Sequence, residues 1–231
     1  MKVLKYVLFC LVMFSLPLLI VASNLRFVVN NTGVYQYIID NYHISRVTGI
    51  DNQQLAKIYR HWVDFYNSKA DTPQIIITKN GHEIDLLSDK EIIHLQDVKG
   101  LMQLDHNVQL ITFFIILACS ALLIWVFRDL RLFLKSLFAG SALTLGFGMV
   151  LAAAALCCFE QLFVLFHEVS FANAFWILDP MRDYLIMMFP GGFFSDISIA
   201  LFAAIIIEAA IIAGLSFWGE QRIGRTANRV A

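Results

Sequence analysis

The side chains best suited to move a proton in this chain are His94 and His167. His94 is followed three residues later by Asp97, and on a helix that spacing places both side chains on one face. A carboxylate in that position can hold an imidazole in one tautomer, as an orienting group does beside a general base. A solvated helix face has the same spacing, so the alternative is a pair with no chemical role.

His167 lies in the segment 160–196, which is dense in Phe, Trp, Leu and Met. Charged and polar side chains are interspersed among these apolar ones: Glu168, Asn173, Asp179, Arg182, Asp183 and Asp196. Aromatic rings at the level of the lipid headgroups are typical of a membrane-interface element. We therefore expect His167 at the interface, either as a reacting group or as a polar residue without chemistry.

Other kinds of site find little support in the sequence. The six histidines show no HExxH or HxxxH spacing, and all four cysteines lie inside apolar runs. We therefore expect no metal, no cofactor and no disulfide framework. No nucleophile elbow or phosphate loop is present, and no basic run longer than two residues suggests a nucleic-acid partner. Any acyl chemistry would use histidine as the base and a nucleophile supplied by the substrate.

The composition requires the bilayer as solvent, since 59% of the 231 residues are apolar and only 15% are charged. Four apolar stretches are long enough to cross about 30 Å of hydrocarbon as helices. We predict transmembrane helices at 1–22, 108–127, 136–159 and 197–218. The first stretch also resembles a cleavable signal peptide, but its length favours a retained span.

The distribution of Lys and Arg sets the orientation of these spans. Basic residues lie at the start of the first span, in the loop 128–135 and in the tail 219–231. These regions share one side in a four-span chain, so we predict that both termini are cytoplasmic. The segment 23–107 and the interfacial loop 160–196 are then extracytoplasmic, which places both histidines on the same side of the membrane.

The segment 23–107 has the pattern of a small α+β unit. Apolar residues from Leu55 to Tyr66 follow helical spacing, and Asp51 can cap that helix. The β-branched run 74–78 and the run 83–87 indicate a hairpin that turns at Asn80-Gly81.

Ser88 and Glu91 form a capping-box pattern at the start of a helix that leads towards the second span. The predicted fold is therefore an all-α membrane bundle of four transmembrane helices with a small α+β extracytoplasmic insertion between spans one and two. Gly140, Thr144, Gly148 and Ala152 recur every four residues in the third span, which predicts close packing in the middle of the bundle.

Glu208 is the one charged residue inside the fourth span. A carboxylate at mid-membrane costs roughly 2.5–3.5 kcal/mol on insertion scales. We expect it to face the bundle interior and to bond a partner such as Thr112, Ser120 or Thr144. A structural hydrogen bond and a functional role both remain open for this residue.

Two stretches of the chain resemble a known family. The run FHEVSFANAFWILDPMRDYLIMMFPGGFF, residues 166–194, and the run EIIHLQDVKGL, residues 91–101, are similar to signatures of the lipoprotein intramolecular transacylases. These are small bacterial four-span membrane proteins. The number of spans, their orientation and the insertion after the first span also agree. Ala174 and Gly191 depart from the family pattern, which often has acidic residues there.

The resemblance implies an acyl shift within one lipoprotein molecule in the bacterial plasma membrane. The acyl chain of the sn-2 glycerol ester on a diacylglyceryl-cysteine would move to the N-terminal α-amine and leave an N-acyl lyso-form lipoprotein. The expected partners are that lipoprotein and membrane lipid, and the oligomeric state is left open. Carried over by motif, His94 and His167 are the acid–base pair and Asp97 orients His94. The residues expected to shape the substrate pocket are Asn173, Trp176, Asp179 and Asp183.

Two other functions compete with this hypothesis. A non-enzymatic scaffold or sensor would use the aromatic loop as a docking surface for an extracytoplasmic partner. An intramembrane hydrolase would release free fatty acid instead of transferring the acyl chain. Which histidine is the base and which the acid also remains open at this point.

Overall fold

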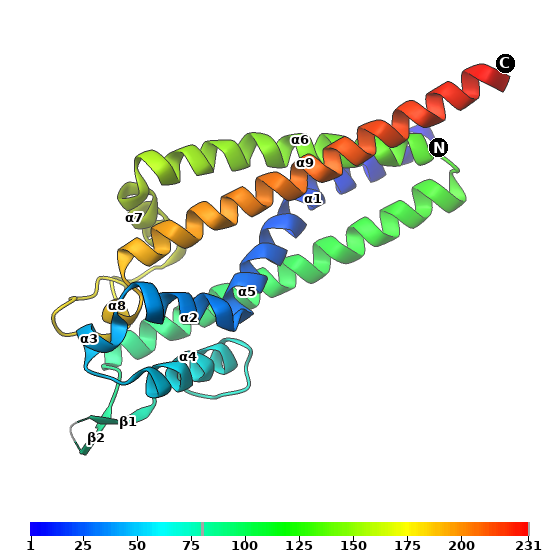
Figure 1. Ribbon diagram of the computed structural model, residues 1–231. Helices are drawn as coiled ribbons and strands as arrows, with labels where there is room; N and C mark the ends of the chain where they lie inside the picture. The colour runs from blue at the N-terminus through cyan, green and yellow to red at the C-terminus, as the bar shows by residue number, and fades with distance from the viewer. Residues whose placement is uncertain (80, 231) are drawn as a thin grey trace. The chain divides into compact units, whose positions relative to one another are not determined.

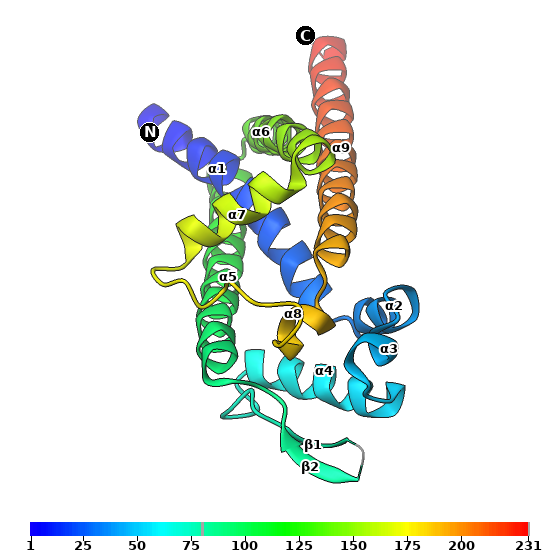
Figure 2. The same ribbon diagram turned by 90° about the vertical axis from the view of Figure 1, so that its left-hand side faces the viewer.

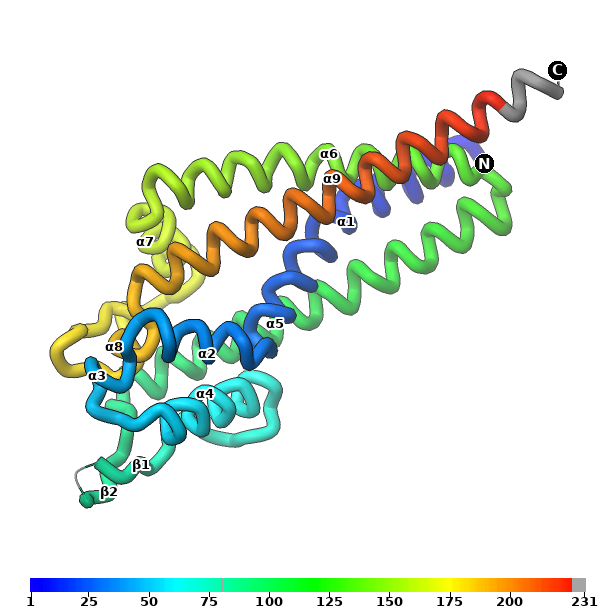
Figure 3. Tube along the Cα trace, in the orientation of Figure 1, coloured from blue at the N-terminus to red at the C-terminus, as the bar shows by residue number. Residues whose placement is uncertain are grey.

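The computed structural model forms two compact units (Figure 1). We call Met1–Leu25, His106–Ala154 and the chain from Ala200 onward the span unit, and Arg26–Asp105 with Ala155–Ile199 the site unit. The structure describes residues 1–79 and 81–230, with side chains up to Arg225 (Figure 3). Asn80 of the predicted turn therefore lies outside the described residues.

Within the described chain, four helices are long and apolar enough to cross a membrane. They are α1 Lys2–Asn30, α5 Asp89–Ala121 with the π-helical turn η1 Leu122–Val126, α6 Leu130–Cys157 and α9 Gly191–Val230. A helix pairs its backbone groups internally, which is what hydrocarbon requires of a spanning segment. The predicted bundle of four transmembrane helices is confirmed, and the chain is a multi-pass membrane protein.

Small residues on α6 let two neighbouring helices approach closely. A Cβ added to Gly140 would meet the backbone oxygen of Met13 in α1 at 2.9 Å. A Cβ on Gly148 would meet Ile206 of α9 at 3.2 Å. The stripe of small residues thus places α6 against both α1 and α9, as the spacing predicts.

The partner predicted for Glu208 is wrong. Its carboxylate accepts a hydrogen bond from Asn24 Nδ2 of α1 at 2.9 Å. The hydroxyls of Thr112, Ser120 and Thr144 instead donate to carbonyls of their own helices, three or four residues back. This local bond satisfies a Ser or Thr side chain inside a helix without help from another element. The Glu208 side chain is also exposed rather than enclosed by the span unit.

The site unit contains the predicted α+β insertion between the first two membrane helices. Its elements are α2 Thr32–Asn41, α3 Ile44–Thr48, α4 Asn52–Tyr66, β1 Ile76–Lys79 and β2 His82–Asp85. The two strands are antiparallel, with Ile76 opposite Asp85 and Lys79 opposite His82. The segment 160–196, which the sequence predicts as an interfacial loop, is called the aromatic segment below. It contains most of α7 Phe159–Ser170 and all of α8 Tyr184–Met188, two more short helices.

Helix α4 supplies one wall of the hydrophobic core. The Asp51 carboxylate accepts hydrogen bonds from the backbone N–H groups of Gln53 and Gln54, so the predicted cap is confirmed. The apolar face of the helix is almost fully buried: Leu55, Ile58, Tyr59, Trp62 and Phe65. Burial of side chains of this size stabilises the fold by about 1.5–3 kcal/mol each.

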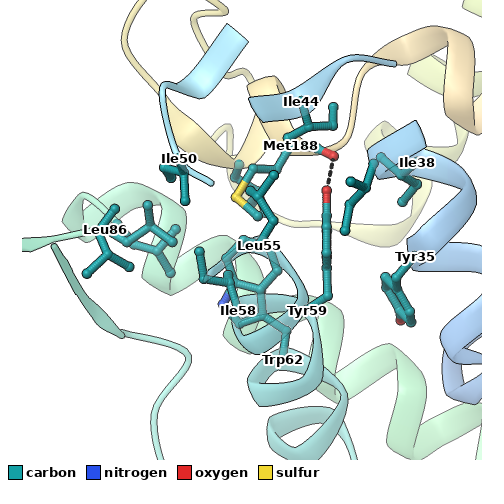
Figure 4. Close-up of a cluster of buried hydrophobic side chains, with 14 of the residues drawn as sticks. Tyr35, Ile38, Ile44, Ile50, Leu55, Ile58, Tyr59, Trp62, Leu86 and Met188 are labelled. Carbon is teal, nitrogen blue, oxygen red and sulfur yellow. Dashed lines mark hydrogen bonds between the residues drawn. The ribbon is translucent and has the colours of Figure 1, made fainter. Parts of the chain in front are cut away.

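The short helix α8 docks on this core. The Tyr59 hydroxyl donates to the backbone oxygen of Met188 at 2.7 Å (Figure 4). Figure 2 shows α8 beside α3 and α4, and the Met188 side chain is fully buried among their residues. The far end of the aromatic segment is therefore fixed to the insertion.

Helix α5 begins where the capping pattern predicts. The Glu91 carboxylate accepts hydrogen bonds from the backbone N–H of Ser88 at 2.8 Å and from its hydroxyl at 2.6 Å. The helix then continues to Ala121 without a break at Gly100. One continuous helix therefore contains both the polar stretch 89–105 and the apolar stretch predicted as the second span.

Candidate active site

His94 lies one turn inside the polar start of α5. The side chains of this helix that contact the aromatic segment are those of Lys90, Glu91, His94 and Asp97. Lys90 and Glu91 come four and three residues before His94, and Asp97 comes three residues after it. They therefore lie on a single helix face. The imidazole of His94 is only 8% exposed, and its ring centroid is 5.1 Å from that of Phe171.

His167 occupies the last turn of α7 and is also 8% exposed. Its Nδ1–H donates to the backbone oxygen of Phe163 at 2.7 Å. Because a carbonyl oxygen only accepts, this bond assigns the proton to Nδ1 and leaves the lone pair of the neutral ring on Nε2. Aromatic rings enclose the imidazole, with centroid distances of 4.2 Å to Phe163, 4.9 Å to Trp176 and 5.5 Å to Phe171.

The structure brings the two predicted histidines together. Their ring centroids are 6.0 Å apart, and the ring planes are inclined by 32°. Hydrogen bonds to ring nitrogens span about 2.7–3.2 Å between heavy atoms. One bound molecule can therefore lie against both imidazoles at once.

The surroundings favour the neutral form of both rings. Burial, reinforced by the nearby His167 ring, lowers the pKa of His94 to about 4, and Asp97 opposes this shift only in part. Burial also lowers the pKa of His167, against the hydrogen bond to Phe163, which raises it. At neutral pH each imidazole is consequently available to take a proton.

Asp97 does not make the contact expected of it. Its carboxylate accepts a hydrogen bond from Asn173 Nδ2 at 2.8 Å, while the buried Nδ1 of His94 has no hydrogen-bond partner among the described residues. The influence of Asp97 on His94 is therefore a through-space charge effect, not a direct bond. The Asp97–Asn173 bond instead connects α5 to the loop that follows α7.

The other predicted pocket residues fall into two groups. Trp176 faces His167, and the Asn173 side-chain oxygen accepts the backbone N–H of Phe175 at 3.0 Å to form a turn before it. Asp179 and Asp183 have contacts of another kind. Asp183 is 4% exposed, accepts the N–H of Asp179 at 2.5 Å and pairs with Lys90 of α5 at 2.6 Å. This pair of aspartates organises the loop and anchors it to α5.

The site also contains residues that no sequence pattern singled out, Phe171 and Lys90 among them. Phe171 lies against both imidazoles, and Lys90 pairs with Asp183. One phenylalanine among the twenty in the chain carries no pattern that would single it out. The ion pair joins residues 93 positions apart, so it has no local signal either. Among the described residues, no cluster of three His, Cys, Asp or Glu side chains could hold a metal ion.

The exterior of α7 is apolar beside the site. Val164, Leu165, Phe166 and Val169 are each more than 40% exposed, and Phe175 and Ile177 continue this exposure after the helix. Together, the fold and the site define a multi-pass membrane protein in which two buried imidazoles lie close together among aromatic rings, next to an exposed apolar surface. The comparisons with known proteins identify the kind of membrane protein.

The sequence model of the family described as lipoprotein intramolecular transacylase Lit matches residues 10–194. The chain therefore belongs to the lipoprotein intramolecular transacylase family and is a membrane-integral acyltransferase. This membership decides against the non-enzymatic scaffold or sensor. No curated protein sequence matches the chain.

Solved structures support the fold. The membrane-integral lipoprotein intramolecular transacylase of Bacillus cereus has a TM-score of 0.81 at 23% identity, and the match covers 100% of both chains. Two variants of that protein, with one histidine replaced by arginine or by alanine, give TM-scores of 0.76 and 0.73 at 22% and 23% identity. These matches cover 98% and 96% of this chain and 96% and 97% of theirs.

Proposed function

We propose that the protein moves an acyl chain from the sn-2 glycerol ester of a diacylglyceryl-cysteine lipoprotein to the α-amine of the same cysteine. The observation that carries this proposal is the pair of buried imidazoles, His94 and His167, with ring centroids 6.0 Å apart. An aminolysis needs one group that accepts a proton and one that returns it, and two neutral histidines meet both needs. The product is an N-acyl lyso-form lipoprotein.

In this proposal His167 is the general base. An α-amine has a pKa of about 7.7–8, so at neutral pH it is largely protonated and cannot attack an ester until it loses a proton. That first proton passes to water. As the free amine bonds to the ester carbon and the carbonyl oxygen becomes an oxyanion, the nitrogen must lose a second proton. The lone pair on Nε2 of His167 accepts this second proton, because Nδ1–H is held by the Phe163 carbonyl.

His94 stabilises the charge that develops. A neutral imidazole has one N–H, and because the two ring centroids are only 6.0 Å apart, we assign this group of His94 to the developing oxyanion. The indole N–H of Trp176 and the second amide hydrogen of Asn173 are further donors to the oxyanion. When the intermediate collapses, the bond from carbon to the glycerol oxygen breaks. The proton taken from the amine passes to that oxygen from the imidazolium, so no other reactant is consumed.

Attack within one molecule lowers the demand on the enzyme. The amine and the ester are joined through the same cysteine, so binding need only select a reactive conformation. The proposed mechanism therefore requires proton transfer, charge stabilisation and a water-poor pocket, and it requires neither a protein nucleophile nor a cofactor.

The lipid chains of the substrate reach the site from the bilayer in this proposal. The exposed apolar residues of α7 and its following loop suit contact with acyl chains at the membrane interface. We further propose that the hydrocarbon-embedded segments are 1–22, 108–127, 136–159 and 197–218, with cytoplasmic termini. The basic residues in 128–135 and 219–231 support that orientation, which places the site on the extracytoplasmic side.

Mass spectrometry of a lipoprotein's N-terminal peptide tests the proposal. The variants His94→Ala and His167→Ala should each lower the rate of N-acyl product formation by about 10²–10⁴-fold, the usual contribution of a general acid or base. His82→Ala is the matched control, because this exposed histidine lies on the β-hairpin. Full acyl shift in both site variants at normal protein levels would remove the histidines from the mechanism. Free fatty acid as the product would favour the hydrolase.

A further inference from the structure

Glu91 is the most deeply buried carboxylate in the site unit, with 1% of the residue exposed. Burial of a carboxylate is costly unless hydrogen bonds replace the lost water. One oxygen accepts from the backbone N–H and the hydroxyl of Ser88, at 2.8 and 2.6 Å. The other oxygen accepts from the backbone N–H of Leu185 at 2.7 Å. The first oxygen thus caps the N-terminus of α5, the helix that contains Glu91, and the second accepts a hydrogen bond from α8.

Leu185 belongs to the first turn of α8, whose N–H groups have no partners inside the helix. Asp183 occupies the N-cap position of α8 but makes no side-chain capping bond there. Its carboxylate instead pairs with Lys90 and accepts the N–H of Asp179. Glu91 thus provides from α5 the cap that the local sequence of α8 does not provide. A capping carboxylate from another helix ties two elements together.

The bond between Glu91 and Leu185 holds the part of the chain that contributes His167 to the candidate active site. The chain from His167 to Leu185 is held to α5 at three places: Asn173 by Asp97, Asp183 by Lys90 and Leu185 by Glu91. Glu91 and His94 are three residues apart on one helix, so the anchored end of the segment lies one turn from the catalytic imidazole. Loss of the Glu91 bond would remove one of the two contacts that hold this end to the helix that carries His94, the other being the Asp183–Lys90 pair.

We propose that Glu91 is a positioning residue for the transacylation. By capping α8 from α5, it fixes the position of the aromatic segment relative to His94 and keeps water away from the two imidazoles. This inference rests on the proposed function. Glu91 itself touches neither the substrate nor the reacting atoms. Its effect should therefore appear in kcat and in the hydration of the imidazoles, and KM should change little.

The test compares Glu91→Gln with Ser88→Ala. The glutamine places an NH2 group against an N–H donor, so it cannot satisfy both α8 and the start of α5. We expect kcat to fall by about 10–100-fold with KM within twofold, the size of effect that a small misplacement of a reacting group produces. Ser88→Ala removes only the hydroxyl contact and leaves the Leu185 bond, so its kcat should stay within about threefold of the parent. Exposed Glu83→Gln on β2 controls for the loss of charge.

A second measurement separates this positioning from a general loss of structure. NMR titration of labelled histidine should show the His94 ring moving towards its ordinary pKa of about 6.5 in Glu91→Gln, because water enters the loosened pocket. The acid limb of the kcat/KM profile should move to higher pH with it. An unchanged kcat and an unchanged His94 titration in folded Glu91→Gln would overturn the inference, as would an equal loss of kcat in Ser88→Ala.

If Glu91→Gln does not fold, Glu91→Asp decides the question. It keeps the charge but is one methylene too short to reach Ser88 and Leu185 together, so it should show the same fall in kcat; activity equal to the parent would refute the role. The unmodified protein is assayed in parallel. Failure of that protein to form N-acyl product refutes the proposed function, while the His94 titration still reports on Glu91.

Discussion

The low pKa of His94 makes a specific prediction about stability. The unfolded chain has an ordinary imidazole with a pKa near 6.5, whereas burial and the adjacent His167 lower the pKa of His94 in the folded protein to about 4. Between these two values the unfolded chain binds a proton that the folded chain does not. Folding is therefore favoured fully above pH 6.5, and this contribution is lost progressively as the pH falls towards 4.

The magnitude follows from proton linkage. One proton bound only by the unfolded state changes the free energy of unfolding by about 1.4 kcal/mol per pH unit. Other groups titrate in the same window, so the effect of His94 is isolated by a difference between the parent and His94→Gln. The variant lacks this titration, and its free energy of unfolding should depend less steeply on pH.

The assay is thermal unfolding in detergent at intervals from pH 4 to 7.5. As the pH falls from 6.5 towards 4, the Tm of the parent should decrease more steeply than the Tm of His94→Gln. His82→Gln, which replaces an exposed histidine on β2, is measured alongside as the matched substitution. A curve for His94→Gln parallel to that of the parent would refute the reasoning, because it would mean that His94 titrates alike in the folded and unfolded states.

Three further substitutions test single contacts. Asn173→Ala removes the partner of the Asp97 carboxylate and should cost about 1.5–3 kcal/mol in the free energy of unfolding, with a fall in kcat; unchanged values in both would show that the bond is not formed. Tyr59→Phe removes the donor to the Met188 carbonyl and should lower the stability of the site unit by about 1–3 kcal/mol in thermal unfolding, whereas an unchanged Tm would contradict the buried bond. Gly140→Val should lower the yield of folded protein because its side chain would collide with α1, while Gly146→Val, with open space around its Cβ position, should be tolerated; equal yields would contradict the close packing.

Local patterns were enough to predict most of the fold. The start of α5 is determined by Ser88 and Glu91, three residues apart, and the start of α4 by Asp51. The membrane helices follow from apolar stretches whose length alone matches the bilayer. Each of these signals lies within a few residues of the element that it defines, so no tertiary information is needed to interpret it.

The contacts that assemble the site could not be predicted in the same way. Asp97 is positioned correctly for His94 by helical spacing, yet it bonds Asn173, 76 residues away. Glu91 bonds Leu185 across 94 residues, and Glu208 bonds Asn24 across 184. Helical spacing identifies which face a side chain occupies, and only the fold determines what the face meets. The proximity of His94 and His167 was expected from the family resemblance, since residue spacing alone placed them only on the same side of the membrane.

The most direct test of the account is a crossover experiment with the purified protein and two synthetic diacylglyceryl-cysteine peptides. One peptide carries an isotope in its sn-2 acyl chain and the other carries an isotope in its backbone, and tandem mass spectrometry locates both labels in the product. The account predicts that the labelled chain moves to the α-amine of its own peptide, and that this product is lost when His94 and His167 are both replaced by alanine. Label exchanged between peptides, labelled free fatty acid, or an undiminished shift in the double variant would contradict it.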